Sequence, residues 1–141
     1  MKELHKALFK FWSQFAWGGK PIPAYPSGRV PQNEPFPYIT FKVPQGAFFS
    51  ATVTTAFVWC QADEDGTFNV QNQRAEILDA VARAIPEAGA LLRFDGGSVV
   101  LRRNPSTFLE YYDPPSEGEE TPTGEPVIGG RISYEMQFYI Y

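Results

Sequence analysis

The sequence predicts a single α+β domain with a mainly antiparallel β-sheet and two helices packed on one face of that sheet. Two segments carry apolar residues at helical spacing, and several shorter segments alternate between apolar and polar side chains or flank turn residues. Along the chain the order is helix, strand, strand, helix, hairpin, loop and strand. A chain of 141 residues buries enough apolar surface for one core, so we expect residues 1–141 to form one domain.

The first seventeen residues predict an amphipathic helix that Gly18 and Gly19 end. Its apolar side chains recur at three- and four-residue spacing: Leu4, Ala7, Leu8, Phe11, Trp12 and Phe15. Residues 19–37 then contain six prolines, which exclude both a helix and a central strand. We therefore expect a long, irregular Pro-rich arm over this range.

Two strands are expected after the arm. Residues 38–43 alternate between apolar and polar side chains until Pro44 breaks the run. Residues 50–61 are rich in Thr, Val, Phe and Trp and are mostly apolar on both faces, which predicts a central strand. Residues 63–66 are expected to form a turn.

Helical spacing resumes over residues 69–85 and stops at Pro86. Residues 90–94 and 98–103 are two short strand-like runs that flank Asp95-Gly96-Gly97. Because Asp-Gly is favoured in two-residue turns between antiparallel strands, these runs predict a β-hairpin.

The next segment, residues 104–130, holds five prolines, four glycines and six acidic residues, with no Lys or Arg. Most of it has too little apolar content to pack, so we expect a long acidic loop. Residues 131–141 alternate regularly, with one apolar face, and predict a C-terminal strand that needs a sheet to receive it.

Charge and cysteine content exclude several classes of protein. The 16 acidic and 12 basic residues give a net charge of −4, which speaks against a protein that grips nucleic-acid phosphates through a basic face. A single cysteine, Cys60, forms no internal disulfide and indicates synthesis in the cytosol. No apolar stretch approaches the roughly 20 residues of a membrane span, and we expect no signal peptide.

Catalytic and metal-binding groups are few. His5 is the only histidine and lacks partners at ligand spacing, while Cys60 lies in a segment where a buried thiol is expected. The carboxylates of the acidic loop lack the spacing and the glycine of a calcium loop, and turn or bend geometry explains Gly96-Gly97 and Gly129-Gly130. We therefore expect no enzyme activity, no cofactor and no metal.

An aromatic set on the strands has two interpretations. It is either part of an ordinary core or the lining of a small-molecule pocket or stacking platform. Its members are Tyr38, Phe41, Phe48, Phe49, Phe57 and Trp59. The core interpretation is the more common one for alternating aromatics on strands.

The order of elements and several local sequences resemble the tail terminators of tailed phages that infect Gram-positive bacteria, and the related minor capsid and tail completion proteins. The resemblance covers nearly the whole chain. It is carried by the first helix and by PFPYITFKVP, ATVTTAFVWCQ, NQRAEILDAVARAI, LLRFDGGSVVLRR and GGRISYEMQFYIY.

This resemblance implies a structural virion protein that is made in the host cytoplasm and lies at the head-proximal end of the tail. It would form a homo-oligomeric ring, a hexamer, that terminates the tail tube. Its partners would be the major tail tube protein and the head-tail connector proteins, with DNA passing through the channel without specific binding. The family has no catalytic residues to transfer to this chain.

Segments that reach neighbouring subunits are expected in the Pro-rich arm and the acidic loop, because long non-packing extensions commonly contact other chains. The candidate interface residues are Pro23, Tyr25, Pro26, Arg29, Phe36, Glu110, Tyr111, Tyr112, Glu117, Glu119 and Glu120. Two alternative functions remain open. They are a head-completion or neck protein, and a small-molecule binding domain that uses the strand aromatics.

Overall fold

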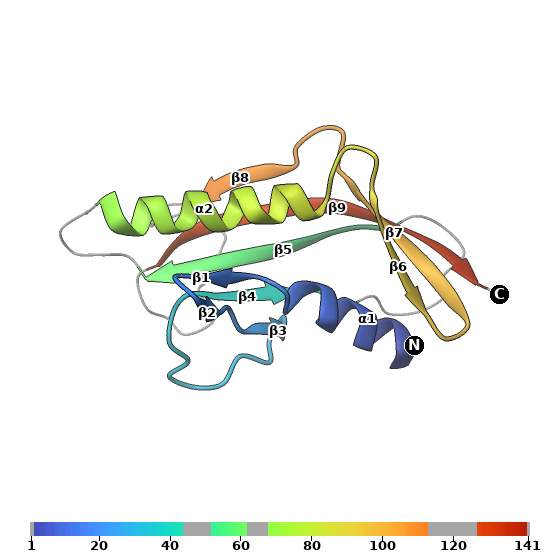
Figure 1. The fold of residues 1–141 in the computed structure, drawn as a ribbon, viewed down its shortest axis with the longest axis horizontal. Coiled ribbons are helices and arrows are strands. Elements are labelled where there is room, and N and C mark those ends of the chain that lie inside the picture. Colours follow the sequence, from blue (N-terminus) through green and yellow to red (C-terminus); the bar gives the residue numbers. More distant parts are fainter. Residues whose placement is uncertain (1, 44–51, 62–67, 113–126, 141) are drawn as a thin grey trace.

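A computed structural model describes residues 2–43, 52–61, 68–112 and 127–140 (Figure 1). The elements in chain order are α1 (Lys2–Trp12), β1 (Ala16–Trp17), β2 (Lys20–Pro21), β3 (Ala24–Pro26), β4 (Tyr38–Phe41), β5 (Thr52–Gln61), α2 (Phe68–Ala84), β6 (Ala90–Phe94), β7 (Gly97–Arg103), β8 (Leu109–Tyr112) and β9 (Val127–Ile140). Strands β1 and β2 pair with each other, and the others form a seven-stranded sheet. The predicted α+β class is confirmed.

The sheet is organised around β9. Its order is β3-β4-β5-β9-β7-β6, and β8 pairs with β9 outside this path. The register places β7 and β8 end to end on one side of β9, from Gly97 opposite Ile140 to Tyr112 opposite Gly129. On its other side β9 pairs along the whole length of β5, which is the central strand that the sequence predicts. All described pairs are antiparallel except β3 with β4.

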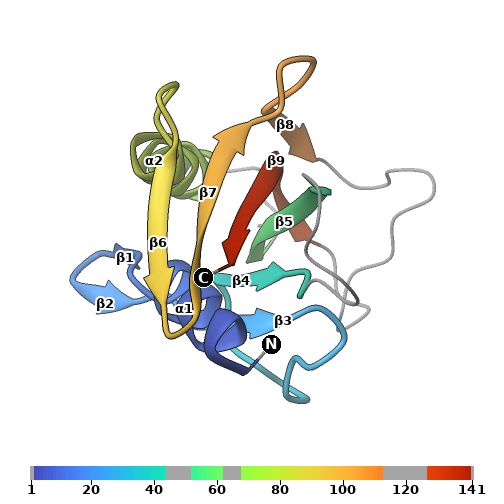
Figure 2. The same cartoon turned by 90° about the vertical axis from the view of Figure 1, so that its right-hand side faces the viewer.

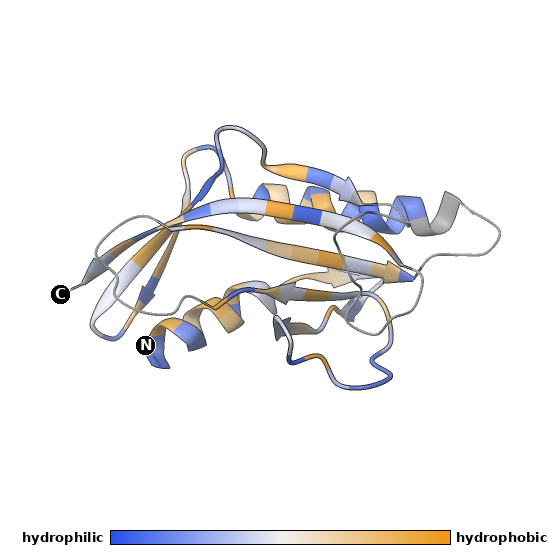
Figure 3. Cartoon of the chain, turned by 180° about the vertical axis from the view of Figure 1, so that it is seen from behind, coloured by the Kyte–Doolittle hydropathy of each residue, from blue (hydrophilic) through white to orange (hydrophobic). Residues whose placement is uncertain are grey.

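Both helices pack on one face of the sheet, as predicted. Helix α1 contacts β6 and β3, and α2 contacts β5 and β9 (Figures 1 and 2). The core between the helices and the sheet has many fully buried members: Leu4, Leu8 and Trp12 of α1, Ile77, Leu78 and Val81 of α2, Ile85, and Ile39, Phe41, Ala56, Val58, Cys60, Val99, Leu101, Ile132, Tyr134 and Met136 of the sheet. Because strand side chains alternate, every second residue points to the other side of the sheet, which we call the outer face. Figure 3 shows the ribbon from behind, coloured by the hydropathy of each residue.

Helix α1 is shorter than predicted. It ends at Trp12, and residues 16–17 form β1, which pairs with β2. Gly18 and Gly19, with φ of 61° and 78°, connect the two strands. Two successive residues with positive φ are typical of a tight hairpin turn, so this glycine pair turns a hairpin rather than ending a helix.

The Pro-rich arm is partly packed into the domain, and the prediction of an irregular arm is wrong for its first part. Ile22 and Ala24 are buried, and β3 pairs in parallel with β4. The prolines nevertheless limit this strand, as expected, because β3 is three residues long and lies at the edge of the sheet.

The predicted acidic loop, residues 104–130, contains one strand and the start of another. Leu109–Tyr112 forms β8, and β9 begins at Val127 rather than at residue 131. Gly129 and Gly130 therefore lie within a strand and are not part of a turn. The remaining loop residues, 113–126, and the predicted turn at 63–66 lie outside the described residues.

The second half of the chain agrees closely with the sequence. Helix α2 begins and ends within one residue of the predicted bounds, and β6 and β7 form the predicted hairpin. Gly96, with φ of 92°, supplies the backbone conformation that the Asp-Gly turn requires.

An arginine joins this hairpin to the end of α2. Arg103 donates hydrogen bonds from Nε to the carbonyl of Ile85, at 2.6 Å, and from Nη2 to that of Ala82, at 2.8 Å. These carbonyls at the helix C-terminus lack helical partners, and the positive charge opposes the negative end of the helix dipole. Arg103 is therefore the C-terminal cap of α2.

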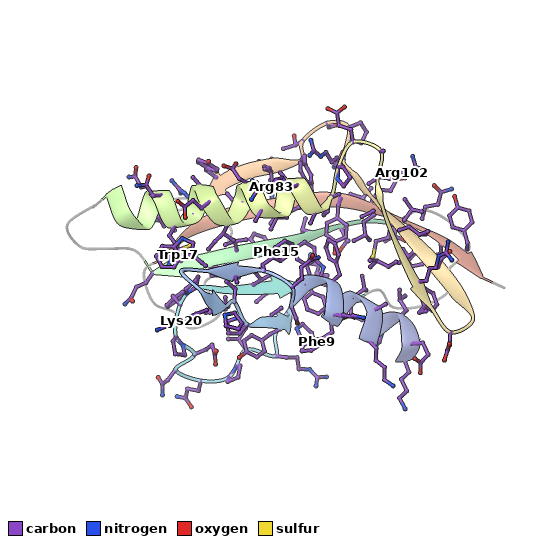
Figure 4. All side chains as sticks on the ribbon, in the orientation of Figure 1. Phe9, Phe15, Trp17, Lys20, Arg83 and Arg102 are labelled. Carbon is purple, nitrogen blue, oxygen red and sulfur yellow. The ribbon has the colours of Figure 1, made fainter. Side chains whose placement is uncertain are left out.

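We expect Arg103→Met to lower the free energy of unfolding by roughly 1.5–3 kcal/mol, the value of hydrogen bonds to a charged group. Urea unfolding followed by circular dichroism measures the loss. Arg102→Met is the matched control, because Arg102 is exposed on the same strand (Figure 4) and should cost less than about 1 kcal/mol. Equal losses for the two variants would contradict the capping role.

Candidate interaction surface

The arm residues proposed as interface candidates mostly contact the chain's own sheet. The carbonyl of Pro23 accepts a hydrogen bond from the Ile39 N–H at 2.9 Å, and that of Pro26 accepts one from the Arg29 N–H at 3.0 Å. Only Arg29 among these arm candidates has an exposed side chain; Pro23, Tyr25, Pro26 and Phe36 are half-buried. Among these candidates, Arg29 is therefore the one whose side chain is available to a partner without rearrangement of the arm.

Tyr25 and Phe36 cover part of the outer face. Both pack on Tyr38 of β4, with ring centroids 6.4 Å and 5.1 Å away respectively. Tyr38 is fully buried and forms a small second cluster with Trp59 of β5, whose ring stacks on that of Phe57 at 5.2 Å. The side chains of Tyr25 and Phe36 therefore pack against the sheet of their own chain.

Polar contacts fix this second cluster. The Trp59 Nε1 donates a hydrogen bond to the Thr40 hydroxyl, at 2.9 Å, in a buried position. Burial, and then a hydrogen bond to Glu34 and its charge, raise the pKa of Tyr25 to about 12, so its hydroxyl stays protonated at neutral pH. The arm is tied to the sheet by aromatic packing and by backbone hydrogen bonds, from the Ile39 N–H to the Pro23 carbonyl and from the Ser27 N–H to the Phe41 carbonyl.

The candidates of the acidic segment that the structure describes lie on β8. Glu110 forms an ion pair with Arg131 of β9, its partner in the register. The Tyr111 ring is 59% exposed, and the guanidinium of the buried Arg74 lies 4.5 Å from its centroid. Tyr112 is described only by its backbone, and Glu117, Glu119 and Glu120 lie outside the described residues.

The strand aromatics do not form a single set. Phe41 faces the helices and belongs to the main core, whereas Tyr38, Phe57 and Trp59 face outward into the second cluster. Phe48 and Phe49 lie outside the described residues. Because the two groups are on opposite faces of the sheet, Phe41 cannot share a pocket with the others.

The two residues weighed for catalysis, Cys60 and His5, lie on different elements. Cys60 is buried on β5, and desolvation raises the pKa of its thiol to about 12 against a smaller lowering by Arg74, so the thiolate is scarce at neutral pH. His5 is exposed on α1. Within the described residues, no three His, Cys, Asp or Glu side chains gather as a metal site would require.

The sequence did not identify the exposed apolar part of the outer face. Val53 of β5 is 61% exposed, Leu91 of β6 is 51% exposed and Tyr139 of β9 is 44% exposed. The register puts Leu91 beside Val100, and alternation places all four side chains on the face away from the helices. Their positions in alternating runs were visible in the sequence, but which face the helices cover was not.

Strand β6 is the last strand on its side of the sheet, with β7 as its only partner in the described chain. The opposite end is β3, which carries Pro26. Prolines protect an edge because they lack an N–H for pairing, and β6 contains none.

None of the helices in the described ranges combines the length and apolar character of a membrane span. Comparison of the chain with known protein families, with curated proteins and with solved structures found no match.

Proposed function

We propose that this chain is a structural subunit of a tailed-phage particle, which forms a ring that terminates the tail tube and joins it to the head connector. The observation that carries the proposal is the outer face, where Val53 and Tyr139 expose large side chains on a side of the sheet that the helices leave uncovered. Large apolar side chains exposed on an uncovered face are available for contacts with other proteins.

The chemistry of the described residues is consistent with a role in assembly. The thiol of Cys60 is buried and protonated, and the histidine lies apart from it on the exposed side of α1. The turn that carries Arg29 and the exposed ring of Tyr111 add contact points on two further elements. A subunit of a ring needs such contacts on two different surfaces, because each copy meets one neighbour on either side.

The test is assembly on tails. Purified protein is mixed with tails that lack it and is viewed by negative-stain electron microscopy, with its mass measured by sedimentation. We expect rings of about six subunits at the head-proximal end of the tube. A chain that stays monomeric and never binds tails would rule the ring out.

Two alternatives have their own readouts. Immunogold labelling that places the protein on the connector, away from the tube end, would favour a head-completion or neck protein. A small molecule that raises the melting temperature and changes the fluorescence of Trp59 would favour a ligand-binding domain. The position of Phe41 on the other face weakens that last alternative.

A further inference from the structure

The edge of the sheet at β6 has backbone groups that point away from β7, the only strand that pairs with it among the described residues. Phe94 pairs with Gly97 across a two-residue turn, so residues 90, 92 and 94 direct their N–H and C=O groups toward β7. The other neighbour of β7 agrees with this assignment. The Asn104 N–H bonds to the Ser133 carbonyl of β9 at 3.2 Å, so even-numbered residues of β7 bond toward β9 and odd-numbered ones bond toward β6. The N–H and C=O groups of Leu91 and Arg93 therefore point outward.

The side chains of β6 are suited to pairing with β6 of a second copy of the chain. On the helix-covered face Ala90, Leu92 and Phe94 are apolar and half-buried, and on the outer face Leu91 is half-exposed beside Val100. We infer that β6 pairs antiparallel with β6 of a second copy, about a two-fold axis between the two Leu92 residues, and so joins two sheets into one.

This register follows from the positions of the outward groups. Antiparallel pairing of Leu91 with Arg93 of the second copy, and the reverse, uses all the outward N–H and C=O groups in four hydrogen bonds. Leu92 then faces Leu92, and Ala90 faces Phe94, so the helix-covered face continues as an apolar surface across the axis. A register centred on Arg93 would place two like charges directly opposite each other, which is unfavourable.

The pairing goes beyond the ring proposed above and does not depend on it. A two-fold contact uses the same surface on both copies, whereas a ring needs two different surfaces. The pair is therefore a form of the free chain, and the ring contacts lie elsewhere.

Cysteine cross-linking tests the register in a Cys60→Ala background. The two-fold axis places residue 92 of one copy opposite residue 92 of the other as a non-hydrogen-bonded pair. Their Cα atoms are then about 4.5 Å apart, which a disulfide can bridge. Leu92→Cys should form a covalent dimer under mild oxidation. Leu91→Cys is the matched control, because its two copies lie roughly 8 Å apart and are too distant to bridge. Cross-linking through residue 91 instead, or through neither residue, would overturn the register.

Sedimentation tests the pairing itself. The wild-type chain should have twice the 15.8 kDa mass of one chain. Leu91→Pro should reduce it to a single chain, since it removes an outward N–H and none of the bonds to β7. Val53→Lys alters the same face away from the edge and should remain a dimer. A wild-type monomer, or a dimeric Leu91→Pro variant that circular dichroism shows to be folded, would refute the inference.

The tail-binding assay separates this inference from the ring. If Leu91→Pro is monomeric in solution but still caps tails, both proposals stand. If Leu92→Cys cross-links and the wild-type chain is a dimer that never binds tails, the edge pairing stands and the ring proposal fails.

Discussion

Replacing Gly129 with alanine is expected to destabilise the protein by at least about 3 kcal/mol, the upper end of the usual cost of overpacking. A Cβ at Gly129 would overlap the backbone carbonyl oxygen of Val58 on β5. A backbone atom cannot rotate away, so relief requires separation of the two central strands and loss of hydrogen bonds between them. Thermal and urea unfolding measure the loss, and poor recovery of soluble protein is an expected consequence.

The comparison with Gly130 gives this prediction a sharp control. A Cβ there would lie 2.6 Å from Cδ1 of Leu78, a side chain on α2. Because the obstacle is a side chain, Leu78→Ala should offset part of the cost of Gly130→Ala in a double-mutant cycle. The same Leu78→Ala change should not rescue Gly129→Ala. If it rescued both, the backbone obstruction at Gly129 would be contradicted.

A second control separates crowding from backbone strain. Gly28 has φ of +83° and nothing within 4 Å of its Cβ position, so Gly28→Ala tests the left-handed conformation alone. Such a residue costs about 1–2 kcal/mol. A loss at Gly129 no larger than this would mean that the two strands adjust easily.

The sequence predicted the elements whose signals are local. The alternation along β5 and the Asp-Gly turn between β6 and β7 depend on neighbouring residues, and both elements were found as expected. Strand β8 was missed because its four residues pair with β9 across a proline-rich, acidic segment. No short-range pattern contains that pairing, since its partners are 17 to 23 residues away in the sequence.

The end of α1 shows a different limit. Phe15 continues the helical spacing of apolar residues, and it is indeed buried, but from a position after the helix has ended. Burial was predicted correctly, whereas the backbone conformation that achieves it was not. The glycine pair carried the missing signal, because two glycines in succession favour a tight hairpin turn as well as a helix end.

The candidate interface was harder to predict than the fold. Tyr25 and Phe36 stood out as aromatic residues in a proline-rich arm, but they pack on Tyr38. An aromatic side chain gives no indication in the sequence of whether it covers its own sheet or a neighbouring subunit. Leu91 and the β6 edge depend on strand order, which a single sequence does not reveal.

Trp12→Ala is expected to cost about 3–5 kcal/mol, because it empties a fully buried site at the junction of α1 and the sheet. The Trp12 ring contacts Phe11, Phe15, Phe41 and Tyr134, with centroid distances between 5.0 and 6.4 Å. The melting temperature should fall by roughly 10–20 °C. Differential scanning calorimetry on wild type and variant provides the measurement.

Phe9 is the matched control on the same helix. Its ring is 51% exposed (Figure 4), so Phe9→Ala removes a similar aromatic group without opening a cavity and should cost less than about 1 kcal/mol. Similar losses for the two variants would mean that α1 is held by its helical propensity rather than by Trp12. An 11-residue helix is marginal on its own in water, so packing of this one side chain is what should keep α1 on the sheet.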